Sequence, residues 1–137
     1  MEEHPQDAHD ALLQQLEEAY GQMVLRAPDH GIRVIGCTLT PLLELDYHHP
    51  SARTDADRQR LNEWIRHSGT FDGVVDFDAA LRDPASSDHL LPAKDSGDHL
   101  HPGPVGYKRM GPGCPTGTSS EALSGCFGRH TTPLRHS

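Results

Sequence analysis

Two short apolar runs, residues 32–39 (IRVIGCTL) and residues 73–77 (GVVDF), constrain the fold more than any other feature of the sequence. Runs of this kind, rich in β-branched residues, are typical of strands buried on both faces of a parallel sheet. Each run follows a stretch with helical spacing of apolar residues, over residues 8–27 and 54–67. The order helix–strand–helix–strand with short links predicts an α/β fold, in which the strands are parallel and both helices pack on the sheet.

The limits of the first helix are predicted from the residues at its two ends. Asp7 is expected to be the N-cap, because its carboxylate can accept a hydrogen bond from an N–H of the first turn. Pro28 is expected to end the helix, because the residue before a proline avoids the α conformation. One apolar stripe is predicted to face the core, and it consists of Leu12, Leu13, Leu16, Tyr20, Met23 and Val24.

The second helix is predicted to place Leu61, Trp64 and Ile65 on its inner face, with Trp64 as an anchor in the core. Residues 42–53 and 78–103 contain turn-forming residues and no apolar period, so we expect loops there. Two strands covered by two helices form only part of an α/β sheet, and a strand without its neighbouring strands leaves an open edge. We therefore interpret the chain as the second half of a larger α/β domain whose N-terminal half is missing.

The composition changes near residue 110. Residues 1–110 contain 19 of the 20 acidic residues, the single Trp and nearly all the periodic apolar residues. Residues 111–137 are rich in Gly, Pro, Ser and Thr and show no apolar period, which predicts a disordered tail. We therefore expect one folded domain over residues 1–110.

The charge and the N-terminal residues argue against several functional classes. With 12 Lys+Arg and 20 Asp+Glu the net charge is −8, so the chain lacks the basic surface of a nucleic-acid binder. No run approaches the ~18 apolar residues of a membrane span. The first residues, MEEHPQD, lack the basic and apolar regions of a signal peptide, so we expect a cytoplasmic chain. Three cysteines are too few for a disulfide framework.

One short segment, DSGDHLHPGPVGY over residues 95–107, contains side chains suited to acid–base chemistry. Asp98 and His101 are three residues apart, so the carboxylate can turn back to accept a hydrogen bond from Nδ1–H of the imidazole. Such a bond fixes the tautomer and leaves Nε2 free as a general base. Pro102 restricts His101 to an extended backbone. On spacing alone, an Asp-x-x-His in a loop is also typical of a surface turn.

The same segment resembles the last conserved block of the SGNH (GDSL-type) hydrolases, the D-x-x-H-P-x-x-x-G-Y stretch. Residues 31–41 and residues 58–84 are also similar to bacterial members of that family. The resemblance implies part of a three-layer α/β/α sandwich around a parallel sheet, and hydrolysis of ester substrates through a Ser-His-Asp triad. It implies that Asp98 is the orienting carboxylate and His101 the general base. Intact members of the family are often secreted.

The sequence departs from the family pattern in the parts that attack the ester. It contains no Gly-Asp-Ser motif for the nucleophile, and no position matches the oxyanion-hole Gly or the Gly-x-Asn-Asp motif. The single asparagine, Asn62, falls inside the second predicted helix. After Tyr107 the Ala-rich helix of the family is broken at residues 111–113. The resemblance therefore implies a truncated hydrolase that is inactive alone, with a separate N-terminal half as a candidate partner.

A different class of function is a non-catalytic protein, either an interaction fragment or a metal binder, since the chain contains eleven histidines. His99 and His101, together with His89 and Asp95, are candidate metal ligands. We favour a solvent-exposed His99 beside a catalytic His101, and we assign no metal ligand and no cofactor.

Several other residues have a functional and a structural interpretation. His48 and His49 either line a pocket or lie in a solvated loop, and Thr38 and Thr40 either bind a ligand at a strand end or favour the strand itself. Cys37 is expected to be a small buried hydrophobe. Cys114 and Cys126 have no C-x-x-C partner and are interpreted as free thiols.

Overall fold

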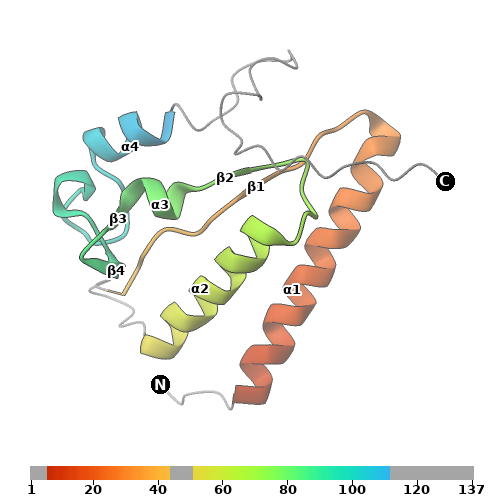
Figure 1. Ribbon diagram of the computed structural model, residues 1–137, viewed down its shortest axis with the longest axis horizontal. Coiled ribbons are helices and arrows are strands. Elements are labelled where there is room, and N and C mark those ends of the chain that lie inside the picture. The colour runs from red at the N-terminus through yellow and green to blue at the C-terminus, as the bar shows by residue number, and fades with distance from the viewer. Residues whose placement is uncertain (1–5, 44–50, 112–137) are drawn as a thin grey trace.

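The structure, a computed structural model, describes residues 6–43 and 51–111 of the chain. Its elements in chain order are α1 (Gln6–Arg26), the 3₁₀ helix η1 (Ala27–His30), β1 (Ile35–Cys37), α2 (Ala52–His67), β2 (Gly73–Val75), α3 (Phe77–Leu81), β3 (Arg82–Asp83), β4 (Ser86–Leu90), the 3₁₀ helix η2 (Pro92–Lys94) and α4 (Pro104–Met110). In Figure 1, α1 and α2 lie side by side on one side of the β1–β2 sheet, and α3 and α4 lie at the end toward which β2 leads. None of the helices in these residues is long and apolar enough to cross a membrane.

The two predicted strands pair in parallel, which confirms the central expectation for the fold. The register is Ile35↔Gly73, Gly36↔Val74 and Cys37↔Val75. Both strands are shorter than predicted. Backbone bonds from Asp72 N to Val34 O at 2.9 Å and from Thr38 N to Val75 O at 3.1 Å continue the pairing just beyond them, and side chains bind the backbone beside these bonds. Asp72 Oδ2 accepts a hydrogen bond from Val34 N at 2.7 Å. At the C-terminal end of β2, Asp76 follows the last strand residue and is the N-cap of α3, where it accepts a hydrogen bond from Ala79 N at 3.0 Å.

The long helices cover only one face of this small sheet. Gly36 is buried beneath the ring of Phe71, so closely that an added Cβ would lie 2.6 Å from the ring. Successive side chains of a strand point to opposite faces. Cys37 therefore points away from Phe71, and it is exposed. The expectations of a buried Cys37 and of a first strand buried on both faces are wrong for this reason.

The first helix begins earlier than its predicted cap. The helix α1 already includes Gln6, so Asp7 lies inside its first turn and is not the N-cap. At the other end α1 stops at Arg26, before Pro28, as predicted, and the chain continues as η1. Gly31 then closes the turn with a φ of 68°, a left-handed conformation that glycine adopts without steric strain.

The second helix also begins before its predicted start at Thr54. Ser51 is the N-cap of α2, and its Oγ accepts a hydrogen bond from Thr54 N at 3.3 Å. A serine in this position satisfies an N–H that the first helical turn leaves unpaired. The helix ends at His67 and Ser68 follows as its C-cap, in agreement with the predicted end.

The segment expected to be a loop, residues 78–103, contains a helix and a hairpin. α3 has 5 residues, and β3 pairs antiparallel with β4. Leu81 of α3 is fully buried and Leu90 of β4 is 5% exposed, so both elements contribute buried apolar side chains. These elements are too short to show the repeated apolar spacing on which their prediction would depend.

The apolar core lies between α1, α2 and the sheet. Its buried members are Leu13, Leu61 and Ile65, and the partly buried Trp64, Phe71 and Val74 pack against them. The rings of Trp64 and Phe71 meet edge to face with centroids 5.6 Å apart, and Tyr20 stacks 6.4 Å from Trp64. The predicted inner face of the second helix, with Trp64 packed against the core, is confirmed.

The predicted stripe of α1 faces the core only in part. Leu13 is buried, whereas Leu12 is 60% and Met23 is 59% exposed. A helix that packs against one neighbouring helix buries a narrow stripe, so the flanking apolar side chains remain in contact with solvent.

A charged centre is buried beside the apolar core. Arg58 on α2 is 5% exposed and forms ion pairs with Asp55 at 2.6 Å and with Asp78 of α3 at 2.7 Å. Its guanidinium also donates to the carbonyl groups of Leu39 at 3.0 Å and Ser87 at 3.2 Å. Nε, Nη1 and Nη2 each donate at least one hydrogen bond, which is the condition for burying a charge.

Asn62 of the same helix holds the segment that follows β1. It is fully buried, donates from Nδ2 to Leu39 O at 2.8 Å, and accepts from Leu39 N at 2.7 Å. Both amide atoms are therefore used in binding the backbone. Asn62 is a structural residue of α2, as its predicted helical position implied.

Arg66 extends the charged centre toward the end of β2. It bonds Asp76 at 2.7 Å and Asp78 at 2.7 Å. The hydrogen bond with Asp76 is the main cause that raises the pKa of Arg66 above its ordinary value. Burial acts to raise the pKa of Asp76, but the bonds from Arg66, from the N–H of Ala79 and from Thr38 outweigh burial and hold it below 3.8.

The helix α4 packs on the backbone that leads into the loop of residues 95–102. Gly103 N donates to Lys94 O at 2.7 Å. Gly106 lies so close to the same carbonyl that an added Cβ would stand 2.5 Å from its oxygen. Glycine permits this close approach because it has no Cβ. The distance between α4 and the start of the loop therefore depends on these two glycines.

Arg58→Ala is expected to lower the free energy of unfolding by about 3–5 kcal/mol, because it leaves Asp55 and Asp78 buried without their counter-charge. Arg60 on the same helix supplies a matched control, since it pairs with Asp10 at 2.5 Å where the side chains are 54% and 49% exposed. Arg60→Ala should lower the free energy of unfolding by at most about 1 kcal/mol. Urea unfolding followed by circular dichroism measures both changes, and equal losses would contradict the prediction.

Gly106→Ala is expected to displace α4 from Lys94 and to destabilise the fold by about 1–3 kcal/mol through overpacking. Gly21 within α1 is the control, since nothing lies within 4 Å of an added Cβ. Gly21→Ala should be neutral or slightly stabilising. Thermal unfolding and the amide shifts of residues 95–102 measure the difference, and a neutral Gly106→Ala would refute the packing argument.

Candidate active site

The loop of residues 95–102 joins η2 to α4 and is closed on itself by backbone contacts. Asp95 and Pro102 form an antiparallel bridge, and Ser96 N donates to His101 O at 2.9 Å. Gly97 turns the chain with a φ of 103°. The loop therefore has a defined path that brings its first arm, at Ser96, beside its second arm, at His101.

Asp98 and His101 form the contact predicted from their spacing. Asp98 Oδ2 lies 2.6 Å from His101 Nδ1. The other oxygen, Oδ1, accepts hydrogen bonds from Leu100 N at 3.0 Å, from His101 N at 2.8 Å and from Ser96 Oγ at 2.8 Å. One carboxylate oxygen therefore holds the loop, and the other faces the imidazole.

These hydrogen bonds hold the pKa of Asp98 well below its ordinary value of 3.8. The bond with the His101 ring is the largest cause, followed by the N–H groups of His101 and Leu100 and by the hydroxyl of Ser96. Asp98 is therefore ionised at neutral pH, and its charge keeps the proton of a neutral imidazole on Nδ1. The His101 side chain is 60% exposed, which leaves it accessible to a substrate or a partner.

The loop contains a second aspartate–histidine pair, which the sequence did not indicate as a pair. Asp95 Oδ2 lies 2.7 Å from His99 Nδ1, and Asp95 Oδ1 accepts from Gly97 N at 2.9 Å and from His99 N at 3.1 Å. His99 adopts a φ of 59°. The backbone at His99 is therefore left-handed and not extended. Each histidine is bound by its own carboxylate, and an Asp-x-x-x-His spacing is the signal that could have indicated the second pair.

The candidate metal ligands do not gather in one place. Within residues 6–43 and 51–111, no three His, Cys, Asp or Glu side chains are arranged so that they could hold a metal ion. His89 instead lies 2.7 Å from Asp88 and 3.0 Å from Ser86. Two other expectations concern residues outside the described ones, namely the pocket or solvated loop of His48 and His49 and the free thiols of Cys114 and Cys126.

Thr38 has a structural role at the end of β1. It is 4% exposed, its Oγ1 donates to Asp76 Oδ1 at 2.9 Å, and the same oxygen accepts from Asp78 N at 2.9 Å. Because the hydroxyl already donates and accepts within the protein, it joins β1 to α3 and is not exposed to a ligand. Thr40 lies half-buried beyond the same strand end.

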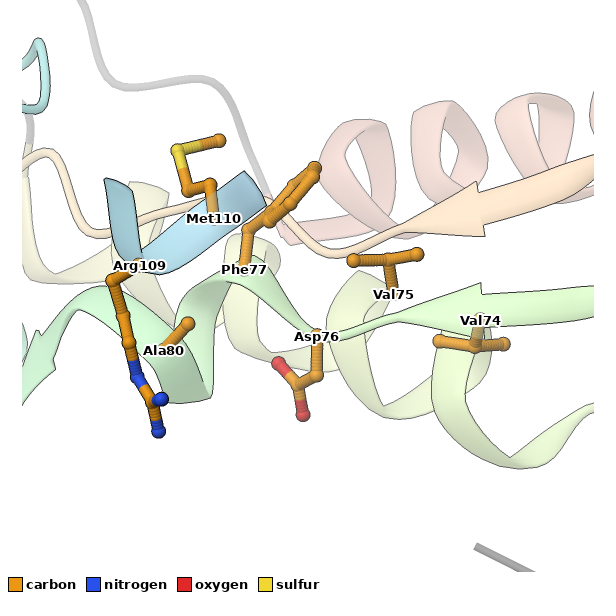
Figure 2. A pocket seen from close by; sticks show the side chains of 7 residues that line it. All are labelled: Val74, Val75, Asp76, Phe77, Ala80, Arg109 and Met110. Atoms are coloured by element: carbon orange, nitrogen blue, oxygen red, sulfur yellow. The ribbon is translucent and has the colours of Figure 1, made fainter. Parts of the chain in front are cut away.

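A small cavity lies between β2, α3 and α4, and Asp98 and His101 do not line it. Its volume is about 80 Å³ and its walls are Val74, Val75, Asp76, Phe77, Ala80, Arg109 and Met110. In Figure 2, the apolar side chains of Val75, Phe77 and Met110 stand on one side of the chain and the Asp76 carboxylate points to the other. Ligand pockets usually have volumes of roughly 300–1,000 Å³, so this cavity is too small for a substrate.

The described serines do not complete a catalytic triad. In such a triad the nucleophile and the carboxylate bond opposite nitrogens of the imidazole. Ser96 donates to Asp98 and not to an imidazole. Ser86 lies 3.0 Å from His89 Nδ1, the same nitrogen that contacts Asp88. Neither contact prepares a serine hydroxyl for attack in this part of the chain.

Comparisons with known proteins identify the family. Residues 3–109 match the model of the GDSL-like Lipase/Acylhydrolase family, a match that includes the parallel sheet, the buried charged centre and the whole loop of Asp98 and His101. A search of curated proteins found no match to the chain. The α/β fold with a parallel sheet is consistent with the SGNH-like fold of that family. The chain belongs to the GDSL-like lipase/acylhydrolase family.

Proposed function

We propose that the chain provides the general base, His101, and the orienting carboxylate, Asp98, of an ester-hydrolase site. The observation that supports this most directly is the 2.6 Å contact between Asp98 Oδ2 and His101 Nδ1. Family membership supports esters as the class of substrate. An imidazole bonded through Nδ1 to an ionised carboxylate has its other nitrogen available to accept a proton.

In this mechanism His101 moves a proton in each half of the reaction. Its Nε2 accepts the proton of a serine hydroxyl as the serine oxygen attacks the ester carbonyl, and it returns that proton to the leaving alcohol. Nε2 then takes a proton from the water that attacks the acyl-enzyme, and it returns this proton to the serine as the acid leaves. Asp98 stays ionised throughout and stabilises the imidazolium.

The nucleophile and the oxyanion donors come, in this proposal, from a partner polypeptide. No Gly-Asp-Ser occurs in the sequence, and both amide atoms of its single asparagine, Asn62, are bonded to Leu39. The β1–β2 sheet has two strands, so each has one edge without a neighbouring strand among the described residues. Open edges of this kind can accept further strands. The chain by itself is then an inactive half of a split hydrolase.

The isolated chain is expected to show no hydrolysis of p-nitrophenyl acetate well above that in buffer. A general base without its nucleophile lacks the covalent route, and each missing oxyanion donor removes roughly 2.7–4 kcal/mol of transition-state stabilisation. The assay compares the purified chain with His101→Ala. Turnover that this variant abolishes would mean that a residue such as Ser96 serves as the nucleophile, and it would refute the prediction.

Adding the separately expressed N-terminal half of a GDSL-like acylhydrolase, with its Gly-Asp-Ser motif, is expected to produce turnover of the same ester. His101→Ala and Asp98→Asn should then lower kcat by roughly 10³–10⁴-fold, because they remove the base or its orienting carboxylate. His89→Ala is the matched control, since His89 pairs with Asp88 at 2.7 Å outside the loop.

The control variant should leave kcat unchanged. Equal losses in all three variants would show a general effect on folding and would contradict the assigned roles. A mixture without any turnover would contradict the proposal of a partner half.

A further inference from the structure

The loop contains one hydroxyl that the mechanism above leaves without a role. Ser96 Oγ donates to Asp98 Oδ1 at 2.8 Å, while Asp98 Oδ2 lies 2.6 Å from His101 Nδ1. We propose that Ser96 is a positioning residue, which holds the Asp98 carboxylate in the orientation that presents Oδ2 to His101. This inference rests on the proposed function, because it adds a residue to the same site.

The geometry of the loop explains why this hydroxyl matters. Asp98 Oδ1 also accepts from the backbone N–H groups of Leu100 at 3.0 Å and His101 at 2.8 Å, which belong to the second arm of the loop. Ser96 belongs to the first arm, which is joined to the second by its own N–H bond to His101 O. The carboxylate is therefore held from both arms. A half-turn about χ2 only exchanges two equivalent oxygens, but a smaller rotation turns the carboxylate plane and breaks the Ser96 bond, so the hydroxyl favours the plane that presents an oxygen to His101.

The charge on the carboxylate agrees with this geometry. The pKa of Asp98 is lowered mainly by the His101 ring, and the hydroxyl of Ser96 lowers it further. A hydrogen bond to the charged form stabilises that form, so Ser96 acts on the ionised Asp98 that the mechanism requires. The hydroxyl donates to Asp98 and not to the His101 ring, so its effect on the base is exerted through Asp98.

The chain contains a second group of one serine, one aspartate and one histidine, and it provides an internal control. Ser86 Oγ donates to Asp88 Oδ1 at 2.7 Å, and Asp88 Oδ1 lies 2.7 Å from His89 Nδ1. The Ser86 bond is the largest cause that lowers the pKa of Asp88 to about 2. This group lies on β4, outside the loop, so its loss should not reach Asp98.

The first experiment is an NMR titration of the full chain, with detection of the Asp carboxyl carbons and the His ring nitrogens. Ser96→Ala is expected to raise the titration midpoint of Asp98 toward 3.8 and to lower the fraction of His101 that carries its proton on Nδ1. Ser96→Thr keeps a hydroxyl, so the Asp98 midpoint and the fraction of His101 protonated on Nδ1 should stay as in the unchanged chain. Ser86→Ala should raise the midpoint of Asp88 alone. An unchanged Asp98 in a Ser96→Ala chain with native amide shifts would overturn the proposal.

The second experiment uses the mixture of this chain with the separately expressed N-terminal half of a GDSL-like acylhydrolase, and its substrate is p-nitrophenyl acetate. Ser96→Ala should lower kcat by roughly 2- to 10-fold, the effect of losing one hydrogen bond, with KM unchanged. Ser86→Ala should change neither constant. A Ser96→Ala variant with raised KM and unchanged kcat would overturn the positioning role.

The two proposals fail in distinguishable ways. If His101→Ala leaves turnover intact, the proposed function is wrong, and the NMR titration still decides whether Ser96 orients Asp98. If His101→Ala abolishes turnover while Ser96→Ala changes neither the Asp98 titration nor kcat, only the positioning role of Ser96 is wrong.

Discussion

The buried guanidinium of Arg58 is the interaction on which the rest of the structure depends. From α2 it reaches Asp55 on its own helix, Asp78 on α3, the backbone of Leu39 after β1 and the backbone of Ser87 on β4. A charge at this depth is tolerated because all three nitrogens of the guanidinium donate to partners. The positions of α2, α3 and the β3–β4 hairpin are therefore specified together, since moving any one of them would leave a buried charge or carbonyl without its bond.

The same constraint extends from the buried centre to the exposed site. Lys94 Nζ donates to Ala80 O of α3 at 2.6 Å, and Gly103 N donates to Lys94 O at 2.7 Å. The loop begins next to Lys94 and ends next to Gly103, so both of its ends are attached to elements that the charged centre positions. The Asp98–His101 pair is exposed, yet the backbone that presents it is anchored. Pre-organisation of this kind suits the role proposed for His101, because a small displacement of a general base lowers the rate.

Prediction from sequence succeeded where the pattern is repeated or local. The parallel strands and the two long helices follow from apolar periodicity, and the Asp98–His101 contact follows from a spacing of three residues. Prediction failed for α3 and the β3–β4 hairpin, which are too short to show a period. It also failed for the Asp95–His99 pair, because the left-handed backbone of His99 places its ring against Asp95, and no apolar pattern indicates that conformation.

By itself, the sequence determined the parallel α/β arrangement, the family and the residues able to act as base and carboxylate. Only the tertiary structure decided that Arg58 and Asp78 are buried together, that Cys37 faces outward, and that Ser96 bonds Asp98. The physical reason is that apolar periodicity is a property of the sequence of one element, whereas the burial of a charge depends on partners from other elements. A polar side chain is stable in the interior only where the folded chain has already placed its partners, and those positions exist only in three dimensions.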